Sequence, residues 1–180
     1  MRTTRCGVPV MIAPLLLALF LPGGGARATT VLPLSMADLV QRSDVVAHVR
    51  VGAVRVVRTA EAPFRVTEIE VVEPFLGARR AEVFELWQRG DGRVFVVCDP
   101  WLEPGQEGLA FLRQVDGRTY LTALAQSWWR IEDQAGGAVA RRDISGLVVV
   151  TRDRTVMMPP DQNRWTHLRQ LVLRACEEVP

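Results

Sequence analysis

The chain has 180 residues, of which 22 are basic and 20 acidic, so its formal net charge is +2, and every basic residue is an arginine. Because the charges nearly balance and form no basic stripe, we expect no nucleic-acid partner. Hydrophobic residues make up 48 % of the chain, which provides for one domain with a substantial core.

Residues 1–28 have the features of a signal peptide. Arg2 and Arg5 give a basic start, an apolar run follows, and Ala26-Arg27-Ala28 is typical of a cleavage site. The apolar run is too short to cross a bilayer and no later run is apolar enough, so we expect no membrane span. The prediction is cleavage near Ala28 and export to the periplasm or the medium, and the alternative is a buried N-terminal helix. Cleavage would remove three arginines and leave 19 basic against 20 acidic residues.

The longest candidate strand is the valine-rich segment Ser43–Arg58. Its apolar residues alternate from Val45 onward and change face after Gly52-Ala53, which predicts a β-bulge. A second change of face is expected near Thr67-Glu68 in the next strand, Phe64–Phe75. Two strands that bend in this way favour a barrel over a sandwich.

Short strand patterns and turn signals continue along the chain, and a helix is predicted at each end of them. Ser35 is expected to cap the first helix. Asp161 is expected to cap the second, which runs to about Glu177 with an apolar stripe at helical spacing. Further strands are expected at 81–87, 93–98, 108–113, 118–125, 128–132, 138–142 and 147–151.

These patterns predict a mainly β fold. We expect a small closed or partly open OB-type β-barrel with a short N-terminal helix and a C-terminal amphipathic helix. Residues 29–156 would form the barrel, and residues 157–180 a linker and the helix packed on it.

Four segments in order resemble a known family: S-D-V-V-A-H-V-R-V (43–51), T-E-I-E-V-V-E-P-F-L-G (67–77), V-C-D-P-W-L-E-P-G-Q-E-G-L-A-F-L (97–112) and G-R-T-Y-L-T-A-L (117–124). Together they look like the netrin-like module, the OB-type barrel of the tissue inhibitors of metalloproteinases, and like uncharacterised exported bacterial proteins that share the pattern. The resemblance covers roughly residues 39–130 and implies the fold.

The animal inhibitors chelate protease zinc with a cysteine at the mature amino terminus, whereas Thr29-Thr30 stands there in this chain. The inhibitory residues therefore do not carry over.

Two cysteines remain after the signal peptide, Cys98 and Cys176. In an oxidising compartment such a pair is expected to form a disulfide. The alternative is two buried thiols.

The sequence points to no catalytic, cofactor-binding or metal-binding residues. His48 and His167 lack neighbouring ligands at metal-binding spacing, so structural or surface roles are expected. The carboxylates Glu68, Glu70 and Glu73 crowd the second strand, where Glu68 and Glu70 share one face, and a solvated polar face is expected. The alternative is a pair of carboxylates at the separation that glycosidase chemistry needs. The serines fall at predicted caps and turns, and no G-x-S-x-G motif is present.

Tryptophan and arginine provide the candidate partner-binding residues, which are Trp101, Trp128, Trp129 and Arg130. Adjacent Trp128 and Trp129 point to opposite faces of a strand, so one should lie in the core and the other at the surface beside Arg130. The alternative is that the C-terminal helix covers both. The sequence thus favours an exported, non-enzymatic binding module whose partner is a glycan or a protein, extracellular proteases included. The alternatives are a small exported hydrolase and a structural component of the envelope.

Overall fold

The computed structural model describes residues 33–91, 93, 96, 98–144, 148–150, 155–157 and 161–179. The helices are α1 (Met36–Gln41), the short 3-10 helix η2 (Leu124–Ser127) and α2 (Trp165–Glu177). The large sheet contains β1 (Val45–Arg58), β2 (Pro63–Leu76), β3 (Val83–Arg89), β4 (Glu107–Val115), β5 (Arg118–Leu121), β6 (Trp128–Gln134), β7 (Gly137–Arg142) and β10 (Asp161–Arg164). β8 (Val148–Val150) and β9 (Thr155–Met157) form a separate two-stranded sheet.

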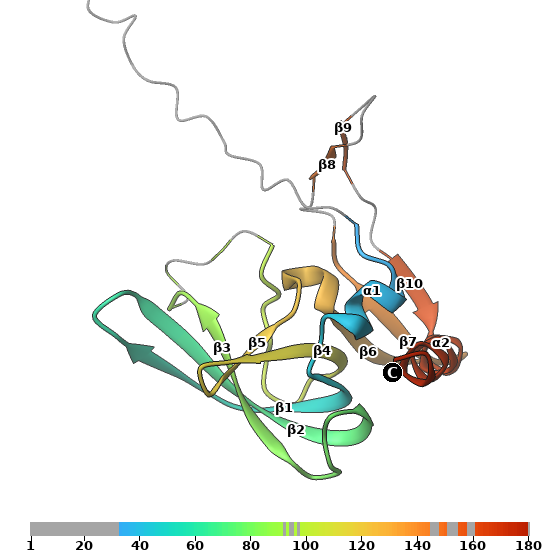
Figure 1. Ribbon diagram of the computed structural model, residues 1–180, viewed down its shortest axis with the longest axis horizontal. Helices are drawn as coiled ribbons and strands as arrows, with labels where there is room; N and C mark the ends of the chain where they lie inside the picture. The colour runs from blue at the N-terminus through green and yellow to red at the C-terminus, as the bar shows by residue number, and fades with distance from the viewer. Residues whose placement is uncertain are drawn as a thin grey trace, which may run out of the picture.

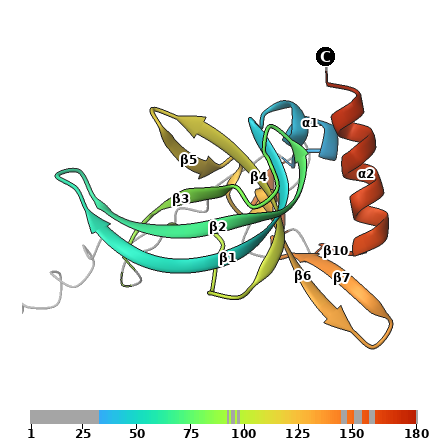
Figure 2. The same cartoon turned by 90° about the horizontal axis from the view of Figure 1, so that it is seen from below.

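Five strands of the large sheet form a partly closed barrel (Figure 1). The strand order is β1-β2-β3-β5-β4-β6-β7-β10, and an additional pairing of β1 with β4 closes the ring. The closure is weakest where β3 meets β5, because these strands pair in parallel at one position, Leu86 opposite Thr119. β6, β7 and β10 continue the sheet beyond the ring (Figure 2). The predicted mainly β fold with a helix at each end is confirmed.

The first strand bends where the sequence predicts. β1 pairs with both β2 and β4, and its register with β2 shifts between Val51 and Val54, around Gly52. β1 pairs with β4 from Val45 to Arg50, before this bulge, and continues to pair with β2 beyond it to Arg58. Ser35 caps α1 as expected, with its hydroxyl accepting from the Asp38 backbone N–H at 3.1 Å.

The second predicted change of face, near Thr67-Glu68, is wrong. β2 and β3 pair without interruption from Phe64 opposite Arg89 to Glu70 opposite Val83. By alternation, the polar residues Arg65 and Thr67 therefore occupy the same inward face as Ile69. Both polar residues are buried, and this end of the barrel interior is polar.

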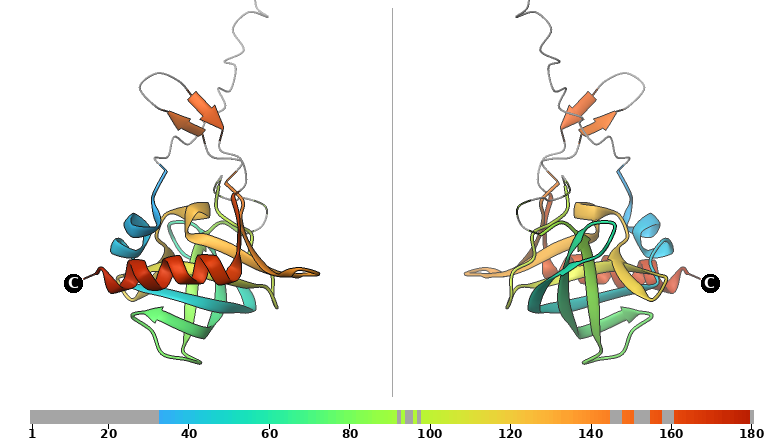
Figure 3. Two further views of the ribbon diagram at one scale, coloured as in Figure 1. Left: turned by 90° about the vertical axis from the view of Figure 1, so that its right-hand side faces the viewer. Right: turned by 90° about the vertical axis from the view of Figure 1, so that its left-hand side faces the viewer.

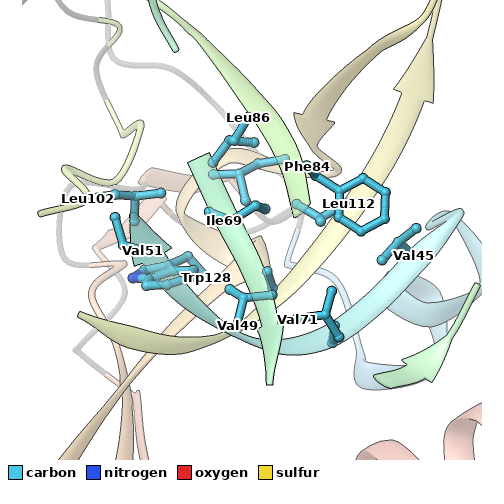
Figure 4. Packing of buried hydrophobic residues seen from close by; sticks show 13 residues of the cluster. Val45, Val49, Val51, Ile69, Val71, Phe84, Leu86, Leu102, Leu112 and Trp128 are labelled. Carbon is cyan, nitrogen blue, oxygen red and sulfur yellow. The ribbon is translucent and has the colours of Figure 1, made fainter. Parts of the chain in front are cut away.

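Two apolar clusters lie on opposite faces of the sheet. The barrel cluster fills the ring (Figure 4), and it comprises Val45, Ala47, Val49, Val51, Ile69, Val71, Phe84, Leu86, Leu102, Ala110, Leu112, Leu121 and Trp128. The helix cluster lies under α2, which runs across the sheet (Figure 3), and it comprises Leu39, Val40, Val46, Leu109, Phe111, Trp129, Ala140, Leu168, Val172 and Ala175.

The chain enters α2 differently from the prediction. Asp161 starts strand β10 rather than capping the helix, because residues 161–164 pair with β7. The Asp161 carboxylate accepts from Arg142 at 2.9 Å, and Arg164 stands at the N-cap without a side-chain capping bond.

Two further strand predictions also differ. The strand expected at 118–125 ends at Leu121 and gives way to η2. The strand expected at 93–98 falls partly outside the described residues, and Arg93, Val96 and Cys98 lie in no strand. The predicted signal peptide, residues 1–28, lies outside the described residues altogether.

Candidate functional site

A pocket of about 750 Å³ opens between the loop 98–106 and the outer strands of the sheet. We call it the Trp101 pocket. It is lined by Cys98, Asp99, Pro100, Trp101, Gln106, Ala125, Trp128, Arg130, Arg141, Asp143 and Gln162. Three of the four predicted contact residues, Trp101, Trp128 and Arg130, thus meet in one pocket although they come from different parts of the chain.

Side chains inside the polar end of the barrel hold the loop in place. Arg65 donates a hydrogen bond to the Leu102 carbonyl, and the Leu102 side chain is fully buried in the barrel cluster. The Gln88 amide donates to Asp99 Oδ1 at 3.0 Å and to the Pro100 carbonyl at 2.8 Å. The loop is therefore fixed at both ends of its Asp99–Leu102 segment.

The end of the loop extends the barrel wall. The Gly105 N–H donates to the Val51 carbonyl at 2.8 Å, and the Val51 N–H donates to the Gln106 carbonyl at 2.8 Å. Gly105 has a φ of 86°, a left-handed conformation that glycine adopts without strain. These bonds are made at the bulge of β1, so the predicted bulge helps to position the pocket.

Trp101 is the exposed aromatic residue of the pocket. Its side chain is 52 % exposed, and the Arg65 guanidinium carbon lies 3.9 Å from the ring centroid. This cation–π contact covers one face of the indole. The orientation of Trp101 is thus set by a buried arginine, while half of its surface remains open to a ligand.

Trp128 lines the pocket from inside the barrel cluster. It is buried, and Figure 4 shows it beside Val51 and Leu102 at the border of the cluster. Gly108 lies against its ring, where a Cβ atom would stand 2.4 Å from the indole Cη2. Only a glycine leaves room for Trp128 in this position.

Trp129 does not reach the pocket. It is 2 % exposed and belongs to the helix cluster, with the Arg142 guanidinium carbon 4.4 Å from its ring centroid. The expectation that Trp128 or Trp129 is exposed is wrong, because both faces of β6 are covered at these two residues. The barrel interior covers Trp128, and the C-terminal helix covers the face that carries Trp129.

A row of polar side chains crosses the strands at the pocket floor. Arg130 on β6 pairs in register with Arg141 on β7, which pairs with Gln162 on β10. Arg141 donates to the Gln162 side-chain oxygen at 3.1 Å, and Arg130 forms an ion pair with Glu132. Sequence reasoning missed Arg141 and Gln162, because their proximity depends on strand register.

Acidic groups complete the pocket. Burial raises the pKa of the Asp99 carboxyl, and the hydrogen bond from Gln88 and the charge of Arg65 oppose this shift. Asp143 lies on the same pocket wall as Arg141. The pocket therefore contains two arginines and two aspartates, without an excess of either sign.

No disulfide joins Cys98 and Cys176 in the structure. Cys98 packs near Ala125 and Ile144 at the pocket, whereas Cys176 on α2 packs with the helix cluster. Burial raises the pKa of both thiols.

The histidines lie away from the pocket. His48 Nε2 is 3.0 Å from Glu107 Oε2, and its ring centroid lies 5.2 Å from that of Trp165 on α2. Burial lowers the pKa of His48, although the negative charge of Glu107 acts in the opposite direction. His167 is exposed.

The three predicted surface carboxylates differ in their surroundings. Glu68 and Glu70 are exposed, whereas Glu73 forms an ion pair with Arg169 of α2. Glu73 therefore helps to fix the C-terminal helix.

Comparisons of the chain with protein-family models, with curated proteins and with solved structures each return no match. Within the described part of the chain, no helix combines the length and the apolar character that crossing a membrane requires.

Proposed function

We propose that this protein is an exported, non-enzymatic binding module and that the Trp101 pocket is its binding site. The observation that carries the proposal is the convergence of Trp101, Trp128 and Arg130 on one pocket. Its volume falls within the range of about 300–1,000 Å³ that is usual for ligand sites. Tryptophan and arginine are also enriched among residues that dominate binding energies.

The rigidity of the loop supports the same proposal. Hydrogen bonds from Arg65, Gln88 and Val51 hold residues 99–106 before any ligand arrives. A prearranged site loses less conformational entropy when it binds. Export is proposed from the basic start, apolar run and cleavage pattern of residues 1–28. A netrin-like origin remains part of the proposal and is supported by the order of the segments and the barrel.

The contacts of the serines and of His48 favour binding over hydrolysis. A hydrolase site of the Ser-His-Asp type would require a histidine beside a serine nucleophile. His48 contacts Glu107 and Trp165, and the Ser43 hydroxyl donates to the Leu39 carbonyl at 2.7 Å. The Ser127 hydroxyl accepts from the backbone N–H of Ala123 at 2.6 Å. These contacts give each group a structural role.

The test is a pull-down from the envelope and medium of the producing cells. The protein is expressed from its full sequence with a tag after Pro180, and retained proteins and sugars are identified. Trp101→Ala and Arg130→Ala should lose a component that the native protein retains. Val83→Ala is the control, because Val83 is 59 % exposed and lies outside the pocket. If the native protein and all three variants retain the same material, the proposed site is refuted.

A further inference from the structure

The geometry points to a short, neutral saccharide as the ligand of the Trp101 pocket, with the open face of Trp101 as a stacking platform. This inference rests on the proposed function and adds the chemical class of the ligand.

The indole of Trp101 offers a surface on which a sugar ring can stack. An aromatic ring offers a flat, apolar surface. Pyranose rings present faces of C–H groups that can pack on such a surface. Trp101 is 52 % exposed and Arg65 covers one of its faces, so a ligand has access to the other. The contact with Arg65, itself bonded to the Leu102 carbonyl, keeps the platform in one orientation.

The polar lining of the pocket contains both hydrogen-bond donors and acceptors. Arg130 and Arg141 supply donors, and the aspartates of the pocket supply acceptors. Gln106 and Gln162 carry both kinds of group on a planar amide. A sugar hydroxyl both donates and accepts, so a mixed lining of this type suits a ligand with many hydroxyls.

The charge balance separates a neutral ligand from an anion. A site for phosphate or carboxylate would concentrate unpaired arginines. Here Arg130 is paired with Glu132, Arg141 bonds to Gln162, and two aspartates face the same space. Neither sign prevails, which favours a ligand without net charge.

The experiment is isothermal titration calorimetry of the protein expressed from its full sequence. The neutral probes are chitotriose, cellotriose, maltotriose and mannotriose, and trigalacturonate is the anionic probe. At least one neutral trisaccharide should bind, with little change when salt is raised, because no charge on the ligand is screened. Trp101→Ala should weaken this binding at least about tenfold, the loss typical of a central contact residue.

Two variants serve as controls. Trp101→Phe keeps an aromatic face and should retain part of the affinity. Trp87→Phe removes an indole that contacts Phe64 edge to face, outside the pocket, and should bind as the native protein does.

Each contrary result has a definite meaning. Binding of no neutral trisaccharide, unchanged binding by Trp101→Ala, or a salt-sensitive preference for trigalacturonate would each overturn the inference. If a protein is instead captured in the pull-down and lost with Trp101→Ala, the proposed site stands and only the saccharide is refuted. If neither sugars nor retained material depend on Trp101, both the inference and the proposed function fail.

Discussion

Replacing Gly108 with alanine should disturb the packing of Trp128 directly. The added Cβ would lie 2.4, 2.5 and 2.8 Å from Cη2, Cζ2 and Cζ3 of the Trp128 ring. These distances are too short for carbon atoms, so the ring or the strand must move. The ring is backed by the barrel cluster and has little space to retreat. Overpacking of this kind typically costs about 1–3 kcal/mol.

Gly136→Ala is the matched control. No heavy atom lies within 4 Å of a Cβ at Gly136, in the β6–β7 turn. This substitution should leave the free energy of unfolding within about 0.5 kcal/mol of the native value, or raise it slightly by restricting the unfolded chain.

The assay is urea or thermal unfolding followed by circular dichroism. For a domain of this size, the cost expected for Gly108→Ala corresponds to a fall in Tm of roughly 2–12 °C. Adding Trp128→Phe removes the outer ring atoms that clash. The double variant should therefore lose at least about 0.5 kcal/mol less than the sum of the two single losses. Equal stability of Gly108→Ala and Gly136→Ala would show that the Trp128 ring does not pack against Gly108, and would refute this account of the pocket wall.

Three other predictions can be checked separately. Because burial lowers the pKa of His48 in the folded protein, its stabilising contribution is present above the unfolded pKa of about 6.5 and is lost as the pH falls below that value. Between about pH 8 and pH 5, urea unfolding should show a steeper fall in the free energy of unfolding for the native protein than for His48→Gln. An equal pH dependence of the two proteins would contradict this. Denaturation without reductant of the protein cleaved near Ala28, which has lost Cys6, should expose two thiols to a thiol reagent, from Cys98 and Cys176, whereas none would indicate the disulfide that the structure lacks. Mass spectrometry of the exported protein should find Thr29 at the amino terminus, and an intact Met1 would contradict cleavage near Ala28.

Local patterns in the sequence were sufficient to predict several elements. The Ser35 cap depends on residues three positions apart, and the bulge of β1 on the glycine at its centre. Strand alternation separated Val45 and Val49 from Val46, but the face of Val46 was expected to lie outside the core, whereas Val46 is buried in the helix cluster. These features were predictable because neighbouring residues determine them.

The errors arose where distant segments meet. Asp161 has the composition of a helix cap, but pairing with β7 draws it into the sheet. Trp129 could not be assigned to the core from β6 alone, because α2 covers it from far along the chain. Arg141 and Gln162 lie at the pocket only because of the registers in which β6, β7 and β10 pair. The sequence before β10 contains no pattern from which the register of β10 on β7 could be predicted.

The most informative error concerns Arg65. Alternation in β2 appeared to change face because Phe64 and Val66 have one parity in the strand, whereas Ile69 and Val71 have the other. Phe64 and Val66 are buried as well, but on the opposite face from Arg65 and Ile69, so both faces of the strand are covered here. Burying a guanidinium is costly, and burial accordingly lowers the pKa of Arg65. The structure offsets part of that cost with the Leu102 carbonyl and the face of Trp101. A leucine at this position would fill the barrel without the desolvation cost, but it would not bond to the loop or fix the indole. The polar end of the barrel is thus better explained by the positioning of Trp101 than by the stability of the core.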